Sequence, residues 1–149
     1  MENITHNVLD FDYIDKGIYV GTNQCCQTHF EEKLLKDGIR ADLSLEKDRI
    51  DAPFGVDFYV WIPVEDHDAP TIEQLEFGAH VLEKWIDMGI KIYAHCKNGH
   101  GRAPTFVAAY FVKHGMQIEE AIDFMKFKRP SIHLQNVQMD ILKEWQSRL

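Results

Sequence analysis

Short apolar runs alternate along the chain with longer segments of helical periodicity. The strands predicted from the β-branched and aromatic runs are 18–21, 41–45, 58–62 and 91–94. The helices predicted from the 3.6-residue spacing are 31–36, 71–89, a segment that begins at Pro104, 118–127 and 136–148. Alternating strands and helices are typical of an α/β fold, so we expect a central, mostly parallel sheet flanked by helices. A single domain over residues 1–149 is predicted, in which residues 1–10 are polar and expected to be loose.

Two of the predicted helices carry signals beyond their periodicity. Thr71 and Gln74 form a capping box at the start of one helix, which ends at Gly89. The helix that Pro104 begins is apolar on nearly every face from residue 106 to 112, so we expect it to be buried at the centre of the domain. The loop between strand 91–94 and this helix is where a parallel sheet places a ligand.

That loop has the composition of a phosphate cradle. It reads His-Cys-Lys-Asn-Gly-His-Gly-Arg from His95 to Arg102, and glycines at 99 and 101 permit the positive φ angles that let consecutive amides converge on an anion. The following helix N-terminus adds donors, and the guanidinium of Arg102 can grip two phosphate oxygens. The same field favours the thiolate form of Cys96, which is therefore the predicted nucleophile. The predicted phosphate-binding residues are Lys97, Asn98, Gly99, His100, Gly101 and Arg102.

The His-Cys-x5-Arg pattern resembles the motif of the cysteine-dependent protein tyrosine and dual-specificity phosphatases. The resemblance extends from Ile18-Tyr19-Val20-Gly21 through 58–63 to the C-terminal helix. It is strongest to the small dual-specificity branch, which includes relatives that act on phosphoinositides or phosphatidylglycerol phosphate. The resemblance implies hydrolysis of phosphomonoesters through a phosphocysteine intermediate, with no metal and no organic cofactor. The implied substrate is a phosphoprotein, carrying phosphotyrosine and also phosphoserine or phosphothreonine, with a phospholipid as the alternative.

One position departs from the pattern of this family. Ala103 stands where the family has a hydroxyl residue, which stabilises the cysteine sulfur as it leaves during hydrolysis of the intermediate. Thr105 lies two residues further on, but helical geometry points its side chain elsewhere. We therefore expect the second half-reaction to be the slower one.

An acidic segment precedes the helix that Thr71 caps. The resemblance implies a general acid on this movable loop, and the Ile-Pro-x-x-Asp spacing that begins at Ile62 selects Asp66. Asp68 is the second choice and Glu65 the third. The alternative, in which the acidic cluster only caps the helix and faces solvent, stays open.

Other polar residues are assigned supporting roles. His95 is expected to be packed and hydrogen-bonded, steadying the loop and indirectly Cys96. The resemblance places Gln135 near the hydrolytic water, although an ordinary polar residue at a helix start is an equal alternative. Lys97 and His100 are expected at the pocket mouth, where positive charge favours polyanionic substrates. Arg129 belongs to a second basic cluster, to which the sequence assigns no role.

Charge and cysteine content narrow the class of protein. A formal net charge of −8 argues against a general nucleic-acid-binding role. No apolar run reaches the length of a membrane span and no leader pattern begins the chain, so we expect no membrane span and a cytoplasmic location. Cys25, Cys26 and Cys96 make a poor disulfide framework, which indicates a reducing compartment, and the first two are interpreted as packing residues.

Two other classes of function compete with a phosphatase. A module that binds phosphorylated partners without turnover is favoured only by Ala103, because such modules usually lack the cysteine or the arginine. A sulfur-transfer or arsenate-reducing enzyme also combines a thiol with an anion loop. The acidic loop that contains Asp66 argues against the latter class.

Overall fold

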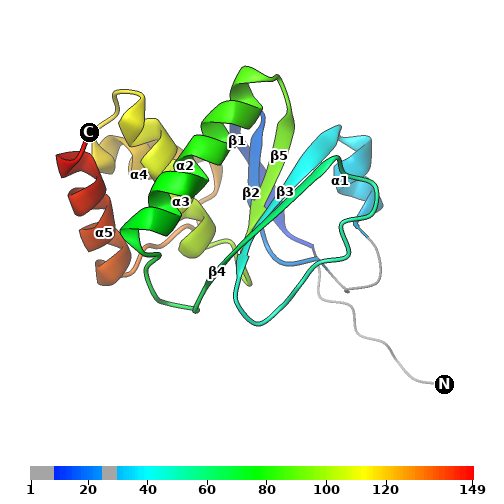
Figure 1. Cartoon of the computed structure of the whole chain (residues 1–149), viewed down its shortest axis with the longest axis horizontal. Helices are drawn as coiled ribbons and strands as arrows, with labels where there is room; N and C mark the ends of the chain where they lie inside the picture. Colours follow the sequence, from blue (N-terminus) through cyan, green and yellow to red (C-terminus); the bar gives the residue numbers. More distant parts are fainter. Residues whose placement is uncertain (1–8, 25–29) are drawn as a thin grey trace.

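Five strands form the sheet at the centre of the molecule (Figure 1). The computed structural model describes residues 9–24 and 30–149. The strands are β1 (Phe11–Asp15), β2 (Ile18–Gly21), β3 (Ile39–Glu46), β4 (Phe58–Val64) and β5 (Lys91–His95). Their order across the sheet is β1-β2-β5-β3-β4, and every pair is parallel except β1 with β2. The predicted α/β fold with a mostly parallel sheet is confirmed.

Helices cover both faces of this sheet. The helices are α1 (Glu32–Lys36), α2 (Ile72–Asp87), α3 (Arg102–Lys113), α4 (Ile118–Lys128) and α5 (Asn136–Ser147). The last four gather on one face, and α1 lies on the other (Figure 1). Successive side chains of a strand point to opposite faces of the sheet, and β5 follows this rule. Ile92 and Ala94 join the larger core under α2 to α5, whereas Tyr93 joins a smaller cluster with Leu34 of α1.

Helix α3 is the best-buried helix and carries the loop of interest at its N-terminus. Every residue from Arg102 to Val112 is buried, as its apolar sequence predicts. The indole Nε1 of Trp145 in α5 donates to the carbonyl of Ala109 over 3.0 Å, which fixes α5 against α3. The residue that begins α3 is therefore held by packing on several sides.

Some boundaries differ from the sequence expectations. Helix α3 begins at Arg102 rather than Pro104, because proline is tolerated throughout the first turn of a helix. Strand β1 was not predicted, and it pairs with β2 at the edge of the sheet. Residues 1–8 lie outside the described part of the chain, while Asp10 accepts a backbone hydrogen bond of 2.9 Å from Thr22. None of the helices in the described ranges has both the length and the apolar character that crossing a membrane requires.

Candidate active site

A single small pocket collects most of the residues that the sequence singles out. It encloses about 130 Å³ at the carboxyl end of β5, where the acidic loop after β4, the loop before α3 and the segment before α5 meet. The lining residues are Asp66, His67, Cys96, Asn98, His100, Gly101, Arg102, His133, Gln135 and Gln138. The predicted nucleophile, arginine, general acid and supporting glutamine thus converge from three separate stretches of sequence.

The loop from 96 to 101 follows β5 and leaves the backbone amides of residues 97–101 without protein acceptors in the described ranges. Cys96 is 2% exposed and directly follows the last residue of β5. The carbonyls of Asn98 and Gly99 both accept from Arg129. Because C=O and N–H point in opposite directions across a trans peptide unit, the amides of Gly99 and His100 point away from Arg129.

Arg129 holds the loop from behind, a role that sequence reasoning missed. Its Nε lies 3.1 Å from the Gly99 carbonyl and its Nη2 lies 3.0 Å from the Asn98 carbonyl. Asp12 and Asp10 of the N-terminal segment balance the charge, at 2.9 and 3.4 Å. The side chain is 1% exposed, whereas its neighbours in the basic cluster face solvent. Nothing in the sequence distinguishes this arginine from a solvated one.

The two loop glycines are needed for different reasons. Gly99 has a φ of +67°, as predicted, and a Cβ there would lie 2.6 Å from the carbonyl oxygen of Gly21. Gly101 does not adopt the positive φ that glycine permits, since its φ is −134° at the N-cap of α3. A Cβ at Gly101 would meet the Gln138 carboxamide oxygen at 2.7 Å. Gly101 is therefore small so that α5 can approach the loop.

Arg102 is buried and joins three parts of the site. Its Nη1 donates to the carbonyl of Val64 over 2.7 Å, and its Nη2 lies 2.9 Å from Glu46 and 3.2 Å from Asp66. Burial raises the pKa of Glu46, but hydrogen bonds from Arg102 and from the Asp48 amide outweigh this effect and leave that pKa below its ordinary value. Glu46 is therefore an anion that orients the guanidinium, a role that no sequence pattern indicates.

The acidic loop brings one of its three carboxylates to the pocket. Asp66 lines the pocket and accepts a hydrogen bond of 3.0 Å from the amide of His67. The carboxylate of Asp68 is exposed and accepts from the amide of Ala69, and Glu65 pairs with Lys47 at 3.6 Å. His67 adopts a φ of +66°, which is unusual for a residue with a side chain. This placement favours Asp66 over both alternatives.

Two glutamines line the wall formed by the start of α5. Gln135 is the N-cap residue of α5, and its Nε2 lies 3.5 Å from Nδ1 of His67. Gln138, which the sequence did not single out, is 1% exposed. Its Oε1 accepts from the Gln135 amide over 2.8 Å and its Nε2 donates to the Asp68 carbonyl over 3.0 Å. Gln138 therefore ties the acidic loop to α5.

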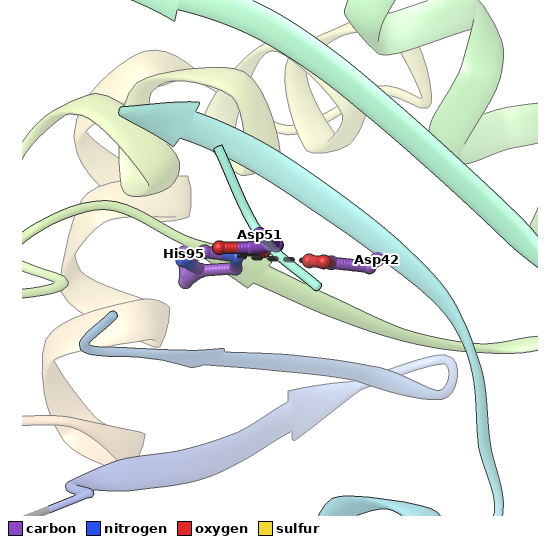
Figure 2. Close-up of side chains that lie close together, drawn as sticks. All are labelled: Asp42, Asp51 and His95. Carbon is purple, nitrogen blue, oxygen red and sulfur yellow. Dashed lines mark hydrogen bonds and ion pairs between the residues drawn. The ribbon is translucent and has the colours of Figure 1, made fainter. Parts of the chain in front are cut away.

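His95 is packed and hydrogen-bonded, as predicted, while its effect on Cys96 stays a prediction. Nδ1 lies 2.9 Å from Oδ1 of Asn23, and Nε2 lies 2.8 Å from a carboxylate oxygen of Asp42 and of Asp51 (Figure 2). Burial alone lowers the pKa of His95, but the two carboxyl groups overcome it and raise the pKa to about 10. In the described part of the chain this trio is the one group of three side chains that could hold a metal ion.

His100 and Lys97 of the loop line two different cavities. His100 lines the active-site pocket, where burial and then the charge of Arg129 lower its pKa. Lys97 is exposed and instead lines a neighbouring cavity of about 560 Å³ together with Arg49. The expectation that both side chains flank one pocket mouth is therefore correct only for His100.

The hydroxyl of Thr105, which lies two residues beyond Ala103, is already hydrogen-bonded to the backbone. Ala103 is fully buried, and Oγ1 of Thr105 donates to the carbonyl of Gly101 over 2.7 Å. Its proton is thus directed at the backbone rather than at Cys96, in keeping with the expectation from helical geometry. Cys25 and Cys26 lie outside the described residues.

The known proteins that this chain resembles in sequence are phosphatases. A family model described as "Polymorphic toxin system, DSP-PTPase phosphatase" matches residues 17–116. The human "Phosphatidylglycerophosphatase and protein-tyrosine phosphatase 1" is 36% identical over 81 residues, which cover 54% of this chain and 40% of that protein. Human "Dual specificity protein phosphatase 5" is 33% identical over 76 residues, covering 50% and 20%. The matched segment therefore spans less than half the length of these relatives.

Solved structures show the same fold over nearly the whole chain. Tk-PTP in its active form has a TM-score of 0.79 at 26% identity, covering 93% of this chain and 97% of that one. PTPMT1 has a TM-score of 0.77 at 25% identity, covering 93% and 94%. The family match includes β5, the loop with Cys96 and Arg102, and the acidic loop with Asp66. The chain belongs to the DSP-PTPase phosphatase family, within the cysteine-dependent protein tyrosine and dual-specificity phosphatases.

Proposed function

We propose that the chain hydrolyses phosphomonoesters through a phosphocysteine intermediate at Cys96. The observation that carries the proposal is the convergence of Cys96, Arg102 and Asp66 on one pocket of about 130 Å³. The amides of residues 97–101 support it, because no group in the described ranges accepts from them and they suit the oxygens of a phosphate dianion. The whole domain is proposed to act as the catalytic unit.

In the first step, Sγ of Cys96 attacks phosphorus and the bond from phosphorus to the leaving oxygen breaks. The electron pair of that bond stays on the leaving oxygen, to which Asp66 donates a proton. Arg102 and the loop amides hold the non-bridging oxygens, where negative charge is concentrated. Arg102 is already aligned by Glu46 and by the Val64 carbonyl, so it needs little reorganisation to bind phosphate.

In the second step, water attacks the phosphorus of phosphocysteine and transfers a proton to Asp66. The phosphorus–sulfur bond breaks, and Cys96 leaves as a thiolate. Gln135, which lines the pocket beside His67, is proposed to orient this water. With Ala103 in place of a hydroxyl and Thr105 directed at Gly101, the leaving sulfur has one donor fewer than the family motif supplies.

The proposed substrate is a phosphoprotein that carries phosphotyrosine, and phosphoserine or phosphothreonine as well. A phospholipid is the second candidate, because the human relative named for phosphatidylglycerophosphatase activity matches this chain. Nucleic acid is not proposed as a partner of a chain with net charge −8. The reaction needs a reduced thiol, so a cytoplasmic, reducing location is part of the proposal.

An aryl phosphate assay tests the proposal directly. The wild-type chain should release phosphate, Cys96→Ser should be inactive, and a Cys25→Ser/Cys26→Ser control should keep wild-type activity. Binding of phosphate or vanadate without turnover in the wild type would instead indicate a recognition module. A panel of phosphotyrosine and phosphoserine peptides beside vesicles that contain phosphatidylglycerol phosphate or phosphoinositides then ranks the substrate classes by kcat/KM.

A further inference from the structure

Three buried side chains lie behind the active-site loop and are not used by the proposed reaction steps. Asp42 comes from β3, Asp51 from the loop between β3 and β4, and His95 from the end of β5 (Figure 2). Asp42 and His95 are 0% exposed and Asp51 is 8% exposed. Both carboxyl groups approach the same ring nitrogen, Nε2, at 2.8 Å.

The surroundings of the ring indicate that both of its nitrogens carry a proton. Nδ1 faces Oδ1 of Asn23 at 2.9 Å, and the amide nitrogen of Asn23 faces Glu46 at 3.5 Å, which supports this orientation of the carboxamide. An amide oxygen can only accept, so Nδ1 of His95 is the donor. Nε2 also faces acceptors, because carboxylate oxygens surround it. The ring is therefore an imidazolium.

The proton count at the two carboxyl groups points the same way. One N–H cannot fully satisfy two ionised carboxylates, and the second oxygen of Asp42, Oδ2, has no hydrogen-bond partner within the described ranges. Two carboxylates and one imidazolium would leave a net negative charge in a buried site, which is costly. One proton on the carboxyl pair makes the group neutral and gives Asp42 a donor.

The neighbouring groups decide which carboxyl group holds that proton. Burial is the largest influence on both carboxyl groups and raises the pKa of each. At Asp51 the hydrogen bonds with His95 and Asp42, followed by the charges of His95 and Arg49, outweigh burial and lower the pKa. At Asp42 burial outweighs the effect of His95, so the pKa is raised. Tyr93 stacks on the imidazole at 5.1 Å, and the hydroxyl of Tyr59 accepts from the Asp51 amide over 3.1 Å. Both tyrosines are neutral, since burial raises the pKa of each. Asp51 is thus the anion and Asp42 the neutral acid.

We propose that Asp42 and Asp51 are positioning residues that share one proton and thereby hold His95 as an imidazolium beside Cys96. The carboxyl of Asp42 accepts from Nε2 and donates to Asp51, while Asp51 supplies the balancing charge. Three oxygens immobilise the imidazolium of His95, which directly precedes the nucleophile. Its positive charge therefore favours the Cys96 thiolate, and its hydrogen bonds fix the start of the loop. This inference rests on the proposed function for its consequence in catalysis.

Substitutions of Asp42 and Asp51 can separate the role of the neutral acid from that of the anion. Asp42→Asn imitates a neutral acid, because a carboxamide can accept from Nε2 and donate to Asp51. The double variant Asp42→Asn/Asp51→Asn removes the anion altogether and leaves a buried imidazolium without a counter-charge. Asp57→Asn is the matched control, since Asp57 is an exposed carboxylate that pairs with Arg40.

Nitrogen-15 NMR of the histidine rings is the first measurement. Both ring nitrogens of His95 should be protonated at pH 7 in the wild type, in Asp57→Asn and in Asp42→Asn, while the double variant should show a neutral ring. A neutral His95 ring in the wild type, or an imidazolium that persists in the folded double variant, would overturn the proposal.

Alkylation of Cys96 by iodoacetamide measures the effect on the thiol. The midpoint of its pH profile should be unchanged in Asp42→Asn and should move upward by about one pH unit or more in the double variant, as loss of one nearby charge implies. An equal displacement in Asp42→Asn would show that Asp42 is the anion and would overturn the assignment. Neither measurement requires turnover, so a catalytically inactive wild type would defeat the proposed function and leave this inference standing.

The pH dependence of stability keeps the proposal testable if the double variant does not fold. The folded pKa of His95, about 10, lies above the ordinary value of 6.5, so the folded state binds more protons between these limits. The contribution of His95 protonation to the free energy of unfolding is complete below pH 6.5 and is lost as the pH rises toward 10. The wild-type free energy of unfolding should fall in this window by the same amount with and without a chelator. A bound metal ion near one per chain, with stability lost on chelation, would contradict the shared proton and identify a metal site.

Discussion

The loop that contains Cys96 and the loop that contains Asp66 form facing walls of one pocket, yet they are held in different ways. The first is supported by buried groups that come from distant segments, with Arg129 behind its carbonyls and Gly99 against the backbone of β2. The second is exposed along much of its length, and the carboxylates of Asp66 and Asp68 accept hydrogen bonds from amides of the same loop. Its long-range contacts include the Gln138 bond to Asp68 and the ion pair of Asp66 with Arg102.

This difference matches the tasks that the two loops are proposed to perform. A phosphate cradle must keep its donors aimed at one point, and preorganised amides lose little free energy in doing so. A general acid has to approach leaving groups of different shape, which a less constrained loop allows. Removing support from the first loop should therefore affect every substrate, whereas changes in the second should depend on the leaving group.

The largest effect is expected at Arg102. Arg102→Lys keeps the charge but removes the planar fork, and losing two hydrogen bonds to a charged group at about 1.5–3 kcal/mol each corresponds to roughly two to four decades in kcat/KM. The loss should be similar for activated and unactivated substrates. A variant that keeps nearly wild-type kcat/KM would show that Arg102 is structural. It would also contradict the view that the loop with Cys96, unlike the loop with Asp66, affects every substrate.

A selective effect is expected at Asp66. Asp66→Asn should lower kcat by about 10²–10⁴-fold for alkyl phosphates and much less for activated aryl phosphates, whose leaving groups need little protonation. Asp68→Asn is the matched control, because its carboxylate is exposed and lies outside the pocket lining. Reversal of these two results would assign the acid to Asp68.

Loss of the buried arginine behind the loop should act on stability as well as on phosphate binding. Arg129→Met leaves two loop carbonyls and two aspartates without their partner, and breaking a buried ion pair costs about 3–5 kcal/mol. Lys126→Met, on the exposed side of the helix α4 that Arg129 caps, should be nearly neutral. Equal denaturation midpoints for the two variants would mean that the loop does not depend on Arg129.

The smallest expected effect concerns the second half-reaction. Ala103→Ser restores a donor to the leaving sulfur, and a hydrogen bond to a charged group is worth about 1.5–3 kcal/mol, or about one to two decades in rate. The wild type should show a pre-steady-state burst with activated substrates, and the serine should raise kcat and reduce the burst. Rapid-quench kinetics without a burst, and without any gain from serine, would indicate that another donor serves the sulfur.

The elements that could be predicted from sequence are those whose determinants are local. The strand–loop–helix around Cys96 combines a short apolar run, a glycine-containing turn and an apolar helix, so its structure follows from adjacent residues. The capping box at Thr71 is likewise local and is present in the structure. Strand β1 was missed because Asp12 and Asp15 interrupt its apolar pattern at the edge of the sheet.

The supports of the site could not be predicted because they depend on contacts between distant segments. Arg129 lies about thirty residues beyond the loop it holds, and nothing local separates it from solvated lysines. Asp42 reads as a polar residue within an apolar strand, and its role emerges only when β3 is placed beside β5. The small size of Gly101 is explained by Gln138 of another helix, rather than by the φ angle that a sequence argument considers.

Detection of the covalent intermediate tests the central claim most directly. The wild type should be mixed with an activated aryl phosphate, quenched in acid within milliseconds and digested for mass spectrometry. A phosphate adduct of one HPO₃ on the peptide that contains Cys96 is predicted, absent in Cys96→Ser and more abundant in the wild type than in Ala103→Ser. Turnover without any adduct on Cys96, or turnover that survives in Cys96→Ser, would contradict the assignment of this cysteine as the nucleophile.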